Sequence, residues 1–275
     1  MARDAQSIFV QQDLGDPEAL EAPCGRAVLI SNPAIDKDTS NPNQMNEDAA
    51  GFWALSESSV VLALADGLGG GPAGAQASAI AMQALDQALS LPAGPDSLRG
   101  RIVDAFEAAN ASVLDLGIGA GTTLVVVEIS DQVARPFHAG DSSAFMVGQR
   151  GRVRFETTPH SPVGYAVASG MLEPEDVHHH EERHILSNCI GSRAMHIEMG
   201  APIPMAPFDT LVLATDGITD NMRRHDLIEL ARIGDPARAA VRIREGVRAV
   251  MAGRDPSLPA HPDDATILLY RRHRT

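Results

Sequence analysis

Acidic residues follow apolar, strand-like runs at several places in this chain. Residues 60–65 are a continuous apolar run that ends in Asp66 and a glycine cluster, and residues 208–215 end in the same way at Asp216. A carboxylate at the end of a buried strand is costly to bury unless something pairs with it, and a hard cation is a natural partner. For Asp66 alone, a strand, a glycine-rich turn and a helix cap explain the pattern equally well.

The pattern gains weight because it is repeated. Six acidic residues lie at predicted strand ends or adjoining turns, with no Lys or Arg in their own motifs: Glu47, Asp48, Asp66, Asp141, Asp216 and Asp263. Carboxylates, carbonyls and water suit Mg²⁺ or Mn²⁺. Two such ions about 3.5–4 Å apart can ionise a bridging water and clamp a phosphate. The repetition favours a divalent-metal site over six unrelated turn residues.

The positioning elements are many short strands and a few helix pairs. Strands are predicted at residues 27–30, 49–55, 60–65, 122–129, 133–138, 144–147, 153–155, 208–214 and 265–270. Helical spacing predicts helices at 73–89, 98–113 (capped by Asp96 or Ser97), 225–232 and 236–251. This order predicts an α+β fold in which two β-sheets pack together with helices outside.

One domain is expected, because no linker divides the chain. Residues 1–23 are predicted to be a loose N-terminal arm with a short edge strand at its end. Residues 24–275 are predicted to be the domain, and residues 157–192 a flap with a weak helix near 163–169. The flap contains the histidine-rich run 178–184. This run mixes in charges and has no fixed ligand spacing, so a solvated flap is favoured over a zinc site.

Composition narrows the classes of function. The 275 residues are 44% hydrophobic with a net charge of −14, which is typical of a globular protein and argues against nucleic acid or anionic membranes as partners. Two cysteines do not make a disulfide framework. With no apolar leader and no segment of membrane-span length, a cytoplasmic location is expected.

Taken in order, the motifs resemble the metal-dependent serine/threonine protein phosphatases of type 2C, in their compact bacterial form. The matching segments span residues 43–270 and are Asn46-Glu47-Asp48-Ala49, Asp66-Gly67-Leu68-Gly69-Gly70, Gly121-Thr122-Thr123, Ala139-Gly140-Asp141-Ser142, His160-Ser161, Thr215-Asp216-Gly217-Ile218-Thr219-Asp220 and Asp263-Asp264-Ala265-Thr266. The resemblance implies a four-layer arrangement, a central β-sandwich of two antiparallel sheets flanked by α-helix pairs.

The resemblance also implies roles for individual residues. Asp66, Asp216 and Asp263 would be the catalytic carboxylates and would hold two Mn²⁺ or Mg²⁺ ions, with Asp66 bridging both. The remaining ligands would be Glu47 and the Gly67 carbonyl for the second ion, and Asp141 for a third, weaker ion. Behind these ligands would lie Asp48 and Asp264. A hydroxide that bridges the ions would attack the phosphorus of phosphoserine or phosphothreonine.

The chain differs from the family in the residues that would bind the substrate phosphate. Asn43 occupies the position where many members have an arginine, and the loop 41–45 contains no basic residue. An amide cannot reproduce the bidentate, charge-assisted bonds of a guanidinium. We therefore expect weak phosphate binding, or an arginine supplied from elsewhere, such as Arg183. Asn43, His160 and Arg183 are the predicted substrate-binding residues.

Three functional hypotheses remain at this point. The first is an active phosphatase that opposes a Ser/Thr kinase and acts on phosphorylated proteins. The second is a weak or inactive regulatory module with the same fold, supported only by Asn43. The third is a metallohydrolase of small phosphate compounds. Turnover of any substrate would eliminate the second, and a comparison of peptide with small phosphoester would separate the first from the third.

Overall fold

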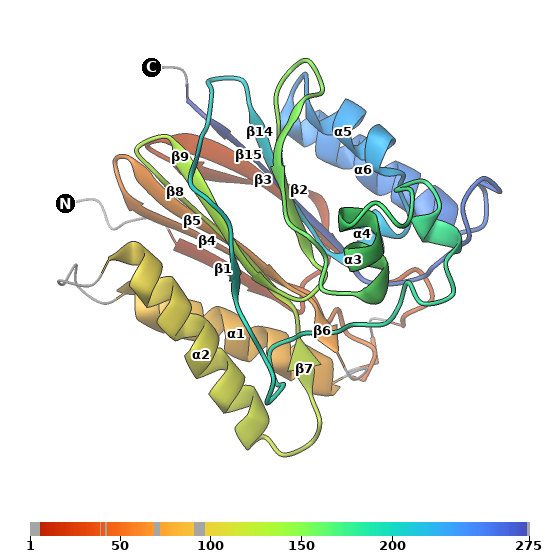
Figure 1. Ribbon diagram of the computed structural model, residues 1–275, viewed down its shortest axis with the longest axis horizontal. Coiled ribbons are helices and arrows are strands. Elements are labelled where there is room, and N and C mark those ends of the chain that lie inside the picture. The colour runs from red at the N-terminus through yellow and green to blue at the C-terminus, as the bar shows by residue number, and fades with distance from the viewer. Residues whose placement is uncertain (1–5, 39, 42, 69–71, 91–96, 274–275) are drawn as a thin grey trace.

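The computed structural model describes residues 6–38, 40–41, 43–68, 72–90 and 97–273. Gly69, Gly70 and Asp96, to which the sequence analysis gave roles, lie outside these ranges. Two antiparallel sheets form the centre of the molecule (Figure 1). The α+β sandwich predicted from the sequence is confirmed.

The first sheet has the strand order β1-β4-β5-β8-β9-β12, with β13 also pairing with β9. Its strands are β1 (Gln6–Val10), β4 (Ala49–Ser56), β5 (Ser59–Ala65), β8 (Leu124–Ser130), β9 (Val133–Ala139), β12 (Glu198–Met199) and β13 (Ile203–Pro204). β5 is central, and six of its seven residues are buried, as a continuous apolar run predicts for a strand covered on both faces.

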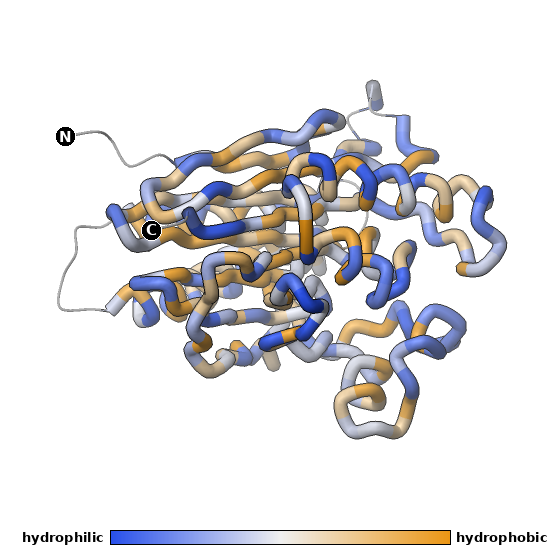
Figure 2. The backbone as a smooth tube through the Cα atoms, turned by 90° about the horizontal axis from the view of Figure 1, so that it is seen from above, coloured by the Kyte–Doolittle hydropathy of each residue, from blue (hydrophilic) through white to orange (hydrophobic). Residues whose placement is uncertain are grey.

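The second sheet has the order β11-β10-β14-β15-β3-β2. Its strands are β2 (Leu14–Ala22), β3 (Gly25–Asn32), β10 (Ser143–Val147), β11 (Val153–Glu156), β14 (Thr210–Ala214) and β15 (Ala265–Arg272). A short ladder of β6 (Gly67–Leu68) and β7 (Gly121–Thr122) lies outside both sheets. Figure 2 shows that hydrophobic residues dominate the central strands, whereas hydrophilic residues gather in the outer loops.

Helix pairs cover the outer faces of both sheets (Figure 1). α1 (Pro72–Ser90) and α2 (Leu98–Asp115) pack on the first sheet, and α5 (Arg224–Ala231) and α6 (Pro236–Met251) pack beside the second. The Ser97 side chain accepts a hydrogen bond from the Gly100 N–H, as predicted for a helix cap. One apolar core therefore fills the space between the sheets and one lies under each helix pair.

The N-terminal segment corrects the sequence analysis in part, although the expected edge strand is present as β2. Its described residues are not a loose arm, because β1 pairs with β4 and β2 pairs with β3. They supply the outermost strand of each sheet. Charged and proline residues in 11–23 hid this role, although such residues are common on edge strands.

The predicted flap contains α3 (Pro162–Ala168) and the 3₁₀ turn η1 (Val177–His179), joined by turns. Its histidine-rich run is not uniformly solvated, because His178 is buried while His179 and His184 are exposed. The short helix α4 (Asp216–Thr219) lies next to the flap (Figure 1). Among the described residues, no helix is both long and apolar enough to span a membrane.

Candidate metal centre

Strand register brings the acidic residues of the first sheet together. Ala49, the first residue of β4, pairs with Ala65, the last residue of β5. Asp48 and Asp66 flank this pair, so their side chains emerge at the same end of the sheet. Both residues are buried, at 1% and 8% exposure.

The second sheet delivers its acidic residues to the same region. Ser143 at the start of β10 pairs with Ala214 at the end of β14. Asp141, shortly before β10, and Asp216, shortly after β14, therefore lie at adjacent strand ends. The Thr215 hydroxyl donates to Asp48 Oδ2 over 3.0 Å and thereby connects the ends of the two sheets. The acidic residues therefore converge where both sheets end.

The backbone of Asp66 is held from the segment 121–123. Its N–H donates to Thr123 Oγ1 at 2.9 Å, and its carbonyl accepts from the Thr123 N–H and the Thr122 hydroxyl, each at 2.8 Å. Both threonines are fully buried. The Gly-Thr-Thr motif therefore fixes the position from which the Asp66 carboxylate projects.

Burial and mutual repulsion raise the pKa values of the carboxyl groups in this cluster. Burial, followed by the charge of Asp216, raises the pKa of Asp66 well above its ordinary value. The same two causes raise the pKa of Asp263 to about 7 and that of Asp220 to about 8. Burial and the charge of Asp141 raise the pKa of Asp216 to about 6. The charged forms of these carboxyl groups are therefore disfavoured, and a bound cation would stabilise them.

The residues present fit divalent cations. Oδ1 of Asp216 and Oδ1 of Asp48 are buried and have no hydrogen-bond partner among the described residues. Buried carboxylate oxygens without partners are costly. The surrounding groups offer oxygen atoms, which suit Mg²⁺ or Mn²⁺ better than softer ions.

Glycines allow the backbone to approach the Glu47 carboxylate. A Cβ at Gly74 would overlap Glu47 Oε2 and would lie 2.8 Å from the carbonyl carbon of Gly67. The Ser78 hydroxyl donates to the Glu47 carbonyl at 2.6 Å. The first turn of α1 therefore packs directly on two of the predicted ligands.

Lys37 is a site residue that the sequence analysis missed. Its ammonium lies 2.6 Å from Asp264 Oδ2 and 3.3 Å from Glu47 Oε1, and it donates to the Met45 carbonyl at 3.1 Å. Burial alone would lower the pKa of Lys37, but the hydrogen bond and the charge of Asp264 raise it. Asp264 also accepts from the N–H groups of Glu47 and Ala34.

We expect Lys37→Met to lower the free energy of unfolding by about 3 kcal/mol, because it leaves the buried Asp264 carboxylate without its cation. Urea unfolding of the metal-free protein measures the change. Adding Asp264→Asn removes the orphaned charge and is expected to recover most of the loss. If the two substitutions are additive instead, the ion pair does not have this role.

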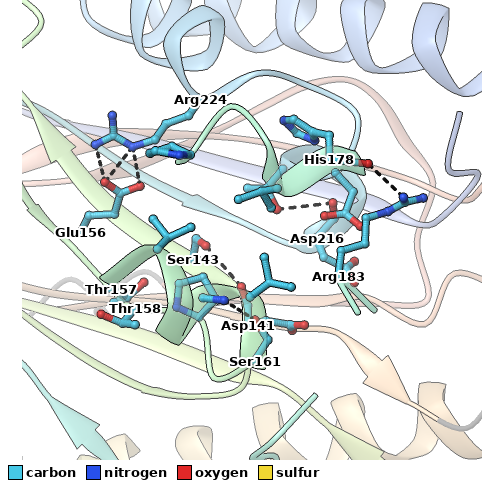
Figure 3. A pocket seen from close by; sticks show the side chains of 18 of the residues that line it. Asp141, Ser143, Glu156, Thr157, Thr158, Ser161, His178, Arg183, Asp216 and Arg224 are labelled. Carbon is cyan, nitrogen blue, oxygen red and sulfur yellow. Dashed lines mark hydrogen bonds and ion pairs between the residues drawn. The ribbon is translucent and has the colours of Figure 1, made fainter. Parts of the chain in front are cut away.

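A pocket of about 470 Å³ adjoins the carboxylates (Figure 3). Figure 3 shows Asp216 and Arg183 on one side of it, and the bidentate Arg224–Glu156 ion pair on the other. Much of the remaining lining is apolar and comes from α3, η1 and α5. Arg183 lines this pocket, whereas Asn43 is exposed and its N–H donates locally to Asn41 Oδ1.

His160 is not placed to contact a substrate, contrary to the expectation from the sequence. It is fully buried. Its Nδ1 accepts from the Gly140 N–H at 3.1 Å and from the Asn188 amide at 2.8 Å, and its Nε2 lies 3.2 Å from Glu198 Oε2. Through the bond from the Gly140 N–H, His160 holds the Gly140 turn from inside the fold.

Acid is expected to destabilise the fold through His160. Burial, followed by the neighbouring His138, lowers the pKa of His160 from 6.5 to about 4. The contribution of neutral His160 to the free energy of unfolding is fully present above pH 6.5 and is lost as the pH falls toward 4. In this window only the unfolded chain binds the proton. We expect a loss of about 2 kcal/mol between pH 7 and pH 5.

The measurement is urea unfolding of metal-free protein at the two pH values. The matched variant, His160→Gln, has no titrating group at this position and is expected to show a smaller loss between them. Identical losses in both proteins would contradict the assignment.

The chain is similar in sequence to known protein phosphatases. The family model described as "Protein phosphatase 2C" matches residues 38–248. The chain is 29% identical over 192 residues to protein phosphatase PhpP of Streptococcus pneumoniae serotype 2, covering 66% of this chain and 77% of that protein. It is 25% identical over 197 residues to the serine/threonine phosphatase stp of Listeria monocytogenes serotype 4b, covering 68% and 77%.

The fold also matches a solved structure. The catalytic domain of the serine threonine protein phosphatase PstP, solved in complex with two manganese ions, superposes with a TM-score of 0.70 at 22% identity. The match covers 91% of this chain and 99% of that chain.

Proposed function

Because the chain belongs to the protein phosphatase 2C family, we propose that it hydrolyses phosphoserine and phosphothreonine in proteins with bound Mn²⁺ or Mg²⁺. The observation that carries this function is the convergence of Asp66, Asp216 and Asp263 in one cluster, where buried carboxylate oxygens lack partners. The chain is thus an enzyme of the phosphoric monoester hydrolase class.

The proposed ligand set is the one that the family resemblance implies, and the acidic cluster supports it. Asp66, Asp216 and Asp263, with Glu47 and the carbonyl of Gly67, would hold two ions, and Asp141 with Asp216 would hold a third. When bound, such ions lower the pKa of coordinated water and offset the charge of a phosphate.

The chain's own residues position the ligands and admit the substrate. Thr122 and Thr123 fix Asp66, and Lys37 holds Asp264 beside Glu47. Arg183 lines the pocket next to Asp216, where a guanidinium can bind a phosphate with charge-assisted hydrogen bonds. We assign the phosphate contact to Arg183 because Asn43 has no charge to offer.

The pocket favours a peptide over a small phosphate compound as substrate. The pocket has a volume of about 470 Å³ and lies next to the carboxylates. Its lining includes the apolar residues Phe145, Val163, Val167 and Leu227. This volume accepts an apolar side chain next to the phosphorylated residue. We therefore propose a phosphorylated protein as substrate, and a Ser/Thr kinase as the enzyme that supplies it.

The test compares kcat/KM for a phosphothreonine peptide that carries a neighbouring leucine with that for p-nitrophenyl phosphate. Burial of the leucine is worth about 1.5–3 kcal/mol, so we expect the same peptide with glycine in its place to react roughly 10- to 100-fold more slowly. Faster turnover of the small phosphoester than of either peptide would favour a small-molecule hydrolase. Failure to turn over any phosphoester would favour a binding module.

A further inference from the structure

Two imidazoles and a carboxylate meet beside the catalytic cluster, and none of the roles above uses them together. His184 comes from the flap, Asp220 ends α4, and His261 lies two residues before Asp263. Each histidine Nδ1 lies 3.8 Å from Asp220 Oδ2, and the three ligand atoms lie within 4.8 Å of one another. The histidine-rich run alone gave no ligand spacing, but the fold completes a set of three from distant segments.

The three side chains do not form hydrogen bonds with one another. A separation of 3.8 Å is too long for a hydrogen bond. The Nδ1 atom of His261 is buried and has no hydrogen-bond partner among the described residues. Both Nδ1 atoms lie near the same oxygen, Asp220 Oδ2, and the two rings are stacked with centroids 4.4 Å apart. An ion between the three atoms would satisfy all of them.

Binding of an ion requires the side chains to adjust. Two ligands at about 2.0–2.1 Å from a tetrahedral ion are roughly 3.4 Å apart, so both histidine–Asp220 distances must shorten from 3.8 Å. The His184 ring must also turn out of its stack with His261, which its exposed position allows, since 46% of its side-chain surface faces solvent. The nearest cation, Arg183, directs its Nη1 atom to the His178 carbonyl at 2.9 Å, where a charge-assisted hydrogen bond holds it.

The donor set selects a different metal from the catalytic cluster. Imidazole nitrogen suits Zn²⁺ and related transition ions, whereas sites made only of oxygen suit Mg²⁺ and Mn²⁺. Two histidines and one carboxylate, with a fourth position open to water, form a known type of zinc coordination.

We propose that His184, Asp220 and His261 bind one transition-metal ion of the zinc class, which fastens the flap to the loop that carries Asp263. The flap supplies part of the pocket lining, including Arg183. A fastened flap restricts exchange of peptide through the pocket, so zinc occupancy slows turnover without replacing the catalytic ions.

The experiment measures Zn²⁺ affinity of the full chain by competition with a chromophoric chelator, with excess Mn²⁺ present to occupy the carboxylate cluster. We expect His184→Ala and His261→Ala each to weaken Zn²⁺ binding by roughly tenfold or more. His179→Ala is the matched control, because His179 is exposed in the same run but lies outside the set; it should bind like the unchanged protein.

Two outcomes would overturn the site. One is equal Zn²⁺ affinity in His184→Ala and the unchanged protein. The other is Zn²⁺ binding that survives both histidine substitutions but disappears in Asp66→Asn, which would place the ion in the carboxylate cluster alone.

Limited digestion with trypsin tests the fastening. We expect Zn²⁺ to slow cleavage after Arg183 in the unchanged protein and in His179→Ala, but not in His184→Ala. Cleavage at equal rates with and without bound Zn²⁺ would contradict a fastened flap. The exposed position of His184 means that its substitution should leave the melting temperature of the metal-free protein unchanged, and melting curves check this.

Discussion

Asp66→Asn is expected to lower kcat/KM for a phosphothreonine peptide by roughly 10³-fold or more, because a shared ligand supplies several kcal/mol of charge stabilisation through bound ions. The amide keeps the size of the side chain but removes the charge that attracts cations. Steady-state kinetics in saturating Mn²⁺ measures the loss.

The same substitution should stabilise the metal-free protein. Burial and the charge of Asp216 disfavour the charged form of Asp66, so removal of that charge relieves repulsion within the cluster. Asp104→Asn, on the exposed face of α2, is the matched control and should change neither activity nor stability. If Asp66→Asn is as active as this control, Asp66 is not a catalytic ligand.

Gly74→Ala is expected to have the second-largest effect. The added methyl group would overlap Glu47 Oε2 and press on the backbone of Gly67. Overpacking of this kind costs about 1–3 kcal/mol of stability. A ligand displaced by about 1 Å can lose roughly 10²-fold in activity. Urea unfolding and kcat/KM measured on the same preparations test both effects.

Gly100→Ala is the control for replacing a glycine in a helix by alanine. Gly100 also lies near the start of a helix, but its added Cβ would meet only Ser97 Oγ, at 3.8 Å. This substitution should leave activity unchanged and stabilise the helix by up to about 1 kcal/mol. Equal behaviour of the two variants would show that the close approach at Gly74 does not position Glu47.

Local pattern was sufficient to predict the strands that carry the acidic residues. The continuous apolar run before Asp66 marks a central strand, and the Ser97 cap marks the start of α2. A carboxylate that ends such a strand is unusual enough to suggest a ligand. The family resemblance then supplied the order of the motifs, which composition alone does not contain.

Contacts between residues that are distant in the sequence could not be predicted from it. Lys37 and Asp264 are 227 residues apart, and nothing in the local pattern around Lys37 distinguishes it from a solvated lysine. His184 and His261 are also brought together only by the fold. His160 was assigned to the substrate as part of the flap motif, but it is buried and hydrogen-bonded to Asn188 and Gly140.

The most direct test of the central claim is the dependence of phosphothreonine-peptide hydrolysis on Mn²⁺ after the protein has been stripped with EDTA. The proposed carboxylate cluster predicts no turnover without metal and a saturable recovery as Mn²⁺ is added. The Asp66→Asn variant is expected to be inactive without metal and to show no comparable recovery. Turnover that persists without metal, or no turnover at any Mn²⁺ concentration while calorimetry shows that Mn²⁺ binds, would contradict it.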